Sequence, residues 1–136
     1  MNGFVGDVRW FSNRNVAPSY NGNVLRAVRS HLNYLINHDV VDSSFQKQDI
    51  GRIIEDLKQY QTRWDARVGG KFFMSLPNDF PIQEMKNFIE KTLPMPIQFD
   101  YSVHRSKNKD GQENLHVHVF LRPVNAETGY KLQWKK

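Results

Sequence analysis

The segment from Leu115 to Arg122 alternates apolar with other side chains, and it constrains the fold more than any other stretch. Successive side chains of a β-strand point to opposite faces. The four aliphatic residues would therefore line one face and suit a core, while His116, His118, Phe120 and Arg122 share the other. Two imidazoles two residues apart on a strand can reach one cation, and a third ligand would complete a site with positions open for substrate oxygens.

A third ligand is available on the preceding segment. The residues from Pro96 to His104 also alternate, and a polar stretch with an Asp110-Gly111 turn signal separates them from Leu115. This pattern predicts an antiparallel hairpin whose polar faces lie side by side. A lone strand histidine is more often structural, but the hairpin makes a cluster of His104, His116 and His118 geometrically plausible.

Composition limits the chemistry that such a cluster can have. The chain has 136 residues, which suits a single domain spanning residues 1–136. It has no cysteine, so any metal must be held by His, Asp or Glu. A net charge of +5 favours a polyanionic partner. We see no apolar run of the roughly 20 residues needed to span a bilayer and no secretory signal, so we expect a cytoplasmic, soluble protein without a membrane partner.

The remaining pattern predicts an α+β fold. Three helices are expected from apolar spacing, and the second opens with a capping-box pattern at Ser43 and Gln46. Including the hairpin, the order is β-α-α-β-α-β-β-β, which predicts a mainly antiparallel sheet with helices on one face and the histidines on the other. The further predicted elements are strands at Phe4–Phe11, Lys71–Leu76 and Tyr130–Trp134, and helices at Asn23–Asn37, Asp42–Asp65 and Pro81–Thr92.

The tyrosines differ in what their positions suggest. Tyr34 falls roughly 140° from the centre of the apolar stripe of its predicted helix. On pattern alone this is typical of an exposed or rim side chain. Tyr20 lies in a predicted loop, and Tyr130 follows the histidine strand after a short turn.

Three segments together resemble the HUH endonucleases, and most closely the relaxases of the MobA/MobL plasmid mobilisation group. The block from Glu113 to His118 is similar to the family's Glu-Asn-Pro-His-x-His block, with Leu115 where proline is usual. Residues 72–79, followed by a helix and Val103-His104, resemble its strand, Leu-Pro turn, helix and histidine strand. Residues 33–39 resemble, more weakly, the helical segment that carries the family's nucleophilic tyrosine.

The resemblance implies a mechanism. His104, His116 and His118 would hold a divalent cation, Mg²⁺ or Mn²⁺ in the family, although imidazoles also suit Zn²⁺. Tyr34 would attack a phosphate of single-stranded DNA at an origin sequence, leaving a 5′-phosphotyrosyl bond and a free 3′-hydroxyl. The resemblance also leaves room for a minimal or truncated domain, or one that works with a partner chain such as an accessory DNA-processing protein.

The order of motifs separates subgroups of that superfamily. In relaxases the tyrosine precedes the histidine pair, which favours Tyr34, with Tyr20 in reserve. A nucleophilic Tyr130 would instead indicate a rolling-circle replication initiator or a transposase. Outside the superfamily mechanism, a non-catalytic single-stranded DNA-binding protein with a structural metal, or a small hydrolase acting on nucleotides, stays open.

Further residues are expected around the metal and the DNA. A carboxylate should orient one ligand, and Asp100 and Glu113 are the candidates. Basic side chains would neutralise phosphates, and aromatic ones would stack on bases. The expected DNA-binding cations are Arg105, Lys107, Lys109 and Arg122, with Trp10, Phe11 and Trp134 as weaker candidates for stacking.

Overall fold

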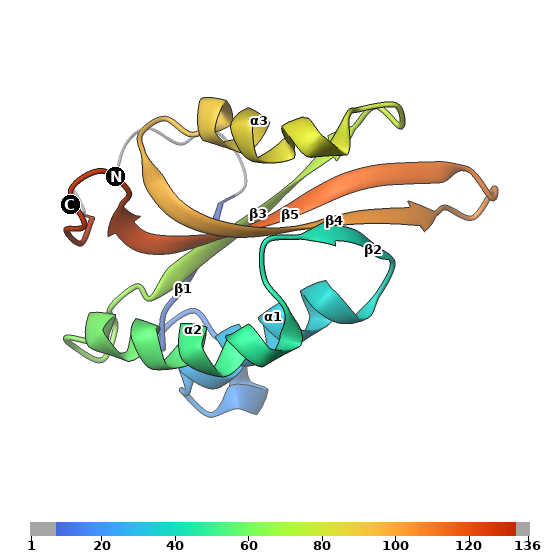
Figure 1. Cartoon of the computed structure of the whole chain (residues 1–136). Coiled ribbons are helices and arrows are strands. Elements are labelled where there is room, and N and C mark those ends of the chain that lie inside the picture. The colour runs from blue at the N-terminus through green and yellow to red at the C-terminus, as the bar shows by residue number, and fades with distance from the viewer. Residues whose placement is uncertain (1–7, 133–136) are drawn as a thin grey trace.

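The computed structural model describes residues 8–132, which form an α+β fold around a five-stranded antiparallel sheet (Figure 1). The strand order is β1-β3-β5-β4-β2, so the two longest strands lie inside the sheet. The strands are β1 (Arg9–Phe11), β2 (Val40–Ser43), β3 (Gly69–Leu76), β4 (Ile97–Lys107) and β5 (Glu113–Asn125). The α-helices are α1 (Val24–Asn37), α2 (Ile50–Leu57) and α3 (Met85–Thr92).

The predicted hairpin is the centre of the sheet. In β4 and β5, His104 lies directly opposite His116, and Ser102 lies opposite His118. The connecting turn is closed by Asn108, whose side-chain oxygen accepts hydrogen bonds from the backbone N–H groups of Asp110 and Gln112. Gly111 has a φ of 75°, a conformation that glycine adopts without steric cost. The pairing places all three histidines on one face.

Helices cover both faces of the sheet, so the prediction that they lie on one face is wrong. Figure 1 shows α3 on one side of the sheet and α1 with α2 on the other. The aliphatic residues of β5 pack with Met85 and Ile89 of α3. Phe120, on the histidine face, packs in a second core with α1 and α2. The histidine face therefore has its own apolar core, and the histidines lie beyond it along β5.

Helix α1 forms as the sequence predicts. The side chain of Asn23 accepts a hydrogen bond from the backbone N–H of Arg26 and caps the first turn. Five apolar residues of the helix are buried: Val24, Ala27, Val28, Leu32 and Leu35. The helix ends at Asn37, because His38 is extended and Asp39 has a φ of 56°. This reversal sends the chain directly into β2.

The segment after α1 differs most from prediction. The start of the expected Asp42–Asp65 helix is strand β2, and α2 ends at Leu57, followed by a 3-10 turn at Lys58–Tyr60. The capping box lies three residues later than predicted, between Gln46 and Asp49. The Ser43 hydroxyl donates instead to backbone carbonyls, including that of Tyr101 in β4. Pairing with β4, which lies far away in the sequence, overrides the local helical pattern.

The ends of the chain are only partly described. The described part of the predicted Phe4–Phe11 strand is β1. The predicted strand at Tyr130–Trp134 is reduced to one bridge between Val124 and Lys131, and Trp134 lies outside the described residues. The predicted Lys71–Leu76 strand begins two residues earlier, at Gly69, and the third helix begins with a 3-10 turn at Ile82–Glu84.

Candidate metal centre

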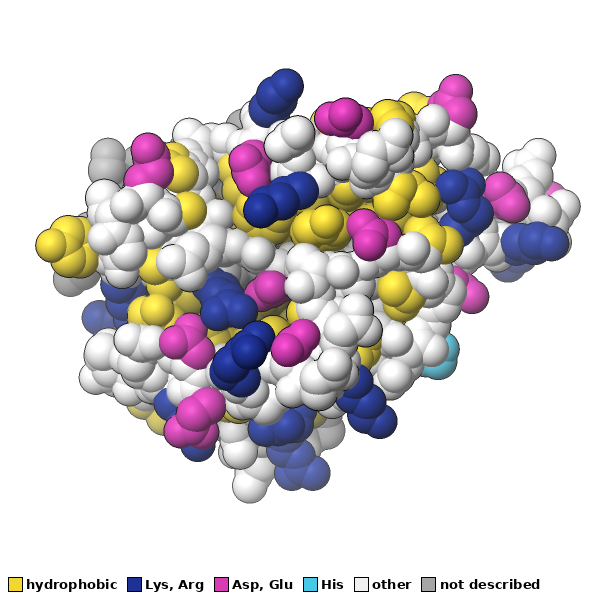
Figure 2. All heavy atoms as spheres, viewed as in Figure 1, with side chains coloured by type: hydrophobic (Ala, Val, Ile, Leu, Met, Phe, Trp, Pro, Cys, Tyr) yellow, Lys and Arg dark blue, Asp and Glu magenta, His cyan; other side chains and the backbone are white. Residues whose placement is uncertain are grey.

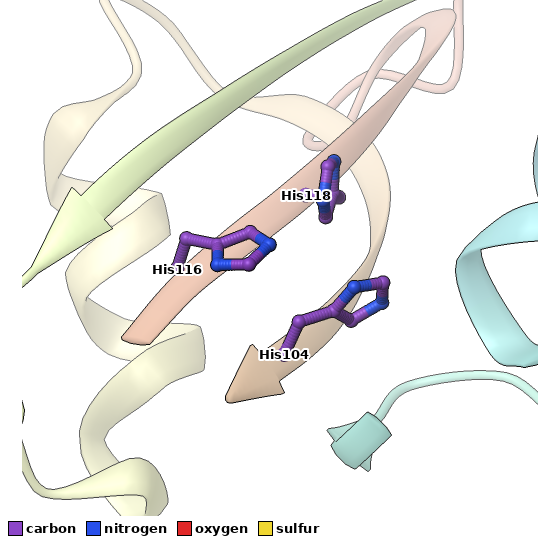
Figure 3. Close-up of side chains that lie close together, drawn as sticks. All are labelled: His104, His116 and His118. Carbon is purple, nitrogen blue, oxygen red and sulfur yellow. The ribbon is translucent and has the colours of Figure 1, made fainter. Parts of the chain in front are cut away.

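Three histidines from β4 and β5 meet on one face of the sheet (Figure 3). The ring centroid of His104 lies 5.3 Å from that of His116 and 4.7 Å from that of His118, and the last two are 5.0 Å apart. Each ring offers one nitrogen, and the three nitrogens lie within 4.8 Å of one another. The predicted cluster is confirmed, and its geometry suits a cation bound between the rings.

Backbone carbonyls orient two of the three rings. His104 Nε2 lies 2.7 Å from the carbonyl oxygen of Leu35, and His116 Nδ1 lies 3.3 Å from that of Asn114. A carbonyl oxygen only accepts, so each of these ring nitrogens carries the proton. The lone pairs then lie on Nδ1 of His104 and Nε2 of His116. Such outer contacts select the tautomer that can bind a metal.

The carbonyl of Leu35 belongs to the last turn of α1, where helix carbonyls lack partners within the helix. It accepts from His104 and also from the Ser102 hydroxyl at 2.8 Å. The carbonyl end of a helix carries partial negative charge, which favours a nearby cation. Helix α1 thus supports the cluster both by hydrogen bonding and by its dipole.

Burial favours the neutral form that metal binding requires in two of the three imidazoles, those of His118 and His104. Burial, with smaller contributions from His104, His116 and Lys71, lowers the pKa of His118 to about 4. Burial also lowers the pKa of His104, although the hydrogen bond to Leu35 opposes the shift. His104 is 4% exposed, whereas His116 and His118 are half-buried. Two of the three rings are therefore partly exposed to solvent.

Neither predicted carboxylate orients a histidine among the described residues. Asp100 Oδ2 accepts from two guanidinium nitrogens of Arg122, at 3.0 and 3.1 Å. Glu113 pairs with Arg105 at 3.4 Å. Both carboxylates are instead paired with guanidinium groups, and among residues 8–132 the hydrogen bonds to the histidine rings come from backbone carbonyls and from Ser102.

Tyr34 lies on the helix that holds His104, one residue before Leu35. Its side chain is 55% exposed, and its ring centroid is 5.6 Å from that of His38. It lines a cavity of about 440 Å³ together with Tyr20, His31 and Lys71. The tyrosine predicted as nucleophile and the one in reserve thus face one cavity.

Tyr130 lies at the opposite end of β5 from the histidines. Its carbonyl oxygen accepts from the backbone N–H of Asn125, the last residue of that strand. Asn125 is seven positions along the strand from His118, and this spacing corresponds to roughly 23 Å. The ring of Tyr130 is 77% exposed. This placement does not bring Tyr130 toward the cluster.

The predicted DNA-binding cations are divided between the two faces. Arg105 and Lys107 pair with Leu115 and Glu113, so they lie on the face opposite to the histidines. Lys109 is exposed in the hairpin turn. On the side shown in Figure 2, basic and acidic side chains are interspersed rather than gathered in one stripe. These cations therefore do not form one continuous DNA-binding surface on the hairpin.

Arg122 shares the histidine face as predicted, but its guanidinium is occupied. It contacts Asp100 of β4 at 3.0 Å and Asp56 of α2 at 3.3 Å. Its side chain is 21% exposed. The contacts join α2 to the sheet, which is a structural role.

Trp10 and Phe11 do not offer free ring faces near the histidines. The Trp10 side chain packs with the core under α3, on the other face of the sheet, and Arg67 lies over its ring. Phe11 is 7% exposed and packs against His31 and Phe120.

Phe73 is the exposed aromatic beside the cluster, and the sequence analysis missed it. It is 64% exposed, lies opposite His118 in the β3–β5 pairing, and its ring centroid is 5.8 Å from that of His118. The alternation in Lys71–Leu76 was a usable signal, because Phe72, Met74 and Leu76 pack on the other face. Applying the hairpin's alternation to β3 would have assigned Lys71 and Phe73 to the histidine face.

Comparison with known proteins adds no relative: no family model, no curated protein and no solved structure matches this chain. Within residues 8–132, no helix is long and apolar enough to cross a bilayer.

Proposed function

We propose that this protein is a metal-dependent enzyme that nicks and rejoins single-stranded DNA through Tyr34, as the resemblance to HUH relaxases implies. One observation carries the proposal. The carbonyl of Leu35 holds His104 in the three-histidine cluster, and the exposed Tyr34 is its neighbour on α1. A metal-binding cluster and an accessible nucleophile are thus joined by one helix turn.

The cluster fits a divalent cation by its donor chemistry. His104, His116 and His118 would each contribute one ring nitrogen, and fewer than a full set of protein ligands leaves positions for phosphate oxygens. A bound cation supplies Lewis-acid polarisation of the scissile phosphate. Mg²⁺ or Mn²⁺ is the family's usual ion, while an all-imidazole set also suits Zn²⁺.

Tyr34 is the proposed nucleophile. Its hydroxyl oxygen forms a bond to phosphorus as the bond from phosphorus to the 3′ oxygen breaks. The phenolic proton is lost to solvent, and the leaving 3′ oxygen takes up a proton. The product is a 5′-phosphotyrosyl bond with a free 3′-hydroxyl, and attack by that hydroxyl reverses the step. An exposed side chain on the helix whose Leu35 carbonyl holds His104 is suited to this role.

The DNA strand would lie over the exposed part of the histidine face. Phe73 offers a ring on which an unpaired base can stack beside His118. The exposed Lys109 in the hairpin turn can neutralise a phosphate further along the strand. Stacking and phosphate contacts of this kind do not depend on the DNA sequence. Recognition of an origin sequence, and any accessory DNA-processing protein, would add to them.

The proposal is tested by trapping the covalent intermediate. Purified protein is incubated with a labelled random-sequence pool of single-stranded DNA, with Mn²⁺ or with EDTA, and separated on a denaturing gel. A protein-linked DNA band that requires metal and disappears in Tyr34→Phe supports the relaxase assignment. Tyr20→Phe and Tyr130→Phe are matched controls that should keep the band.

Other results would redirect the assignment. Loss of the band only in Tyr130→Phe would favour the order found in replication initiators and transposases. DNA binding without any adduct would favour a non-catalytic binding protein. Turnover of small phosphodiesters without an adduct would favour a nucleotide hydrolase.

A further inference from the structure

A cavity of about 440 Å³ lies beside the histidine cluster, between β1, α1, β3 and the loop that contains Tyr20. This volume is in the range of pockets that hold small organic ligands, roughly 300–1,000 Å³. Its lining combines aromatic rings with two basic side chains, whereas an unused packing defect would be apolar. The residues that matter here are Arg9, Tyr20, His31, Tyr34 and Lys71.

The two basic side chains of the cavity lie side by side. Arg9 and Lys71 are directly opposite each other in the antiparallel pairing of β1 and β3. Opposed side chains have Cβ atoms about 5 Å apart, and like charges in this position repel. Among residues 8–132, neither forms an ion pair with a carboxylate. Lys71 Nζ lies 5.4 Å from the centroid of the Phe11 ring, a cation–π contact that leaves its charge in place. Two cations without a carboxylate partner at one cavity suit an anion such as a phosphate.

His31, one of the residues that line the cavity, has a ring nitrogen without a partner. Nε2 of His31 is buried and makes no hydrogen bond among the described residues. An unsatisfied buried polar atom costs about 1–3 kcal/mol. A ligand that brings a hydrogen-bonding edge next to the ring would remove that cost. Nucleobases have such edges, and they also stack on rings like that of Tyr20.

The cavity adjoins the metal cluster through Lys71. Lys71 lies opposite Phe120, so it is the diagonal neighbour of His118 on the same face, at about 7–8 Å between Cβ atoms. Burial is the main cause that lowers the pKa of both His31 and His118, and the charge of Lys71 adds to the shift in each case. A phosphate on Lys71 and one at the cluster would therefore be neighbours, as consecutive phosphates of one strand are.

We propose that this cavity binds one nucleotide of the DNA strand, next to the nucleotide whose phosphate lies at the histidine cluster. The phosphate contacts Arg9 and Lys71, and the base lies against Tyr20 with a polar edge at His31 Nε2. This inference rests on the proposed function for its ligand class. It assigns residues outside the histidine strands to DNA binding.

The phosphate contacts are tested by the salt dependence of binding. Affinity for a labelled oligothymidine is measured by fluorescence anisotropy over a series of salt concentrations, in EDTA so that no cleavage occurs. Each lost phosphate contact should reduce the slope of log K against log salt by about 0.7. Arg9→Met and Lys71→Met should each show this loss. Lys71→Arg should keep the slope, as should Lys86→Met, an exposed lysine of α3 on the other side of the sheet.

The base contact is tested by NMR of the histidine ring nitrogens. Thymidine 5′-monophosphate should shift the Nε2 signal of His31, and inorganic phosphate should leave it in place. Unchanged salt slopes in both Arg9→Met and Lys71→Met, or an unshifted His31 signal, would overturn the inference. Arg9 is exposed, so its substitution tests the contact without disturbing the fold.

The two proposals can fail separately. If the salt slopes change as expected but no covalent adduct forms, the nucleotide site stands and the nicking activity does not. If the adduct forms while the slopes are unchanged, the nicking activity stands and the cavity is not part of the DNA site. Absence of any oligothymidine binding would contradict the nucleotide site directly.

Discussion

His31 should make the fold sensitive to acid. Burial, with smaller contributions from Lys71 and His118, lowers its pKa from 6.5 to about 3. The unfolded chain therefore takes up a proton on this ring at a higher pH than the folded protein does. The stability due to the neutral ring is fully present above pH 6.5 and is lost as the pH falls from there toward 3.

The magnitude follows from the separation of the two pKa values. At about pH 4.5, two units below the unfolded value, the loss due to His31 is about 2–3 kcal/mol. Urea unfolding of wild type and His31→Leu at about pH 7 and pH 4.5, both in EDTA, measures this difference. The variant should lose less stability on acidification by that amount. His38→Leu, which removes an exposed histidine at the end of the same helix, should lose as much as wild type.

Equal losses of stability on acidification in wild type and His31→Leu would contradict this prediction. The comparison isolates His31 because both proteins keep His118, whose lowered pKa acts in the same direction. Equal losses would mean that the ring of His31 is solvated in the folded protein. The inference that His31 Nε2 is a buried atom without a hydrogen-bond partner would then be wrong.

Three further predictions concern the cluster and its supports. Phe73→Ala should weaken oligothymidine binding in EDTA by about 1–3 kcal/mol, because it removes an exposed ring on which a base can stack. An unchanged Kd, measured by fluorescence anisotropy, would argue against base stacking on Phe73. Ser102→Ala should weaken Mn²⁺ binding, measured by calorimetry, about 10–100-fold, because the Ser102 hydroxyl shares the Leu35 carbonyl with His104. An affinity equal to that of wild type would show that Ser102 does not support His104. Asp100→Asn should lower the free energy of unfolding, measured in urea, by about 1–3 kcal/mol, because it leaves the guanidinium of Arg122 with one carboxylate fewer. An unchanged free energy of unfolding would contradict the structural role of that pair.

The histidine cluster could be predicted because its geometry is local. Alternation along β5, a turn signal and a second alternating strand are enough to place His104 beside His116 and His118. The same logic predicted α1, whose apolar spacing and capping asparagine are both read within a few residues. Local periodicity therefore predicted both the three histidines of the cluster and the helix that carries Tyr34.

The features that sequence reasoning missed depend on distant contacts. Strand β2 has only four residues and exists because it pairs with β4, about sixty positions away. The position of α3 on the opposite face from α1 and α2 depends on how both faces of the sheet are filled, which periodicity within one element does not specify. The carbonyl of Leu35 has no sequence signature as a histidine partner, because every residue of the chain carries the same backbone carbonyl group.

The most direct test of the central claim is to locate the covalent bond to DNA. The adduct formed with Mn²⁺ and a random-sequence single-stranded pool is digested with nuclease and trypsin, and the peptides are sequenced by mass spectrometry. Metal-dependent attack by Tyr34 should leave a nucleotide attached to this residue, and the modified peptide should be absent in EDTA and in His116→Ala. A nucleotide attached to another residue, or an adduct that forms equally well without metal, would contradict it.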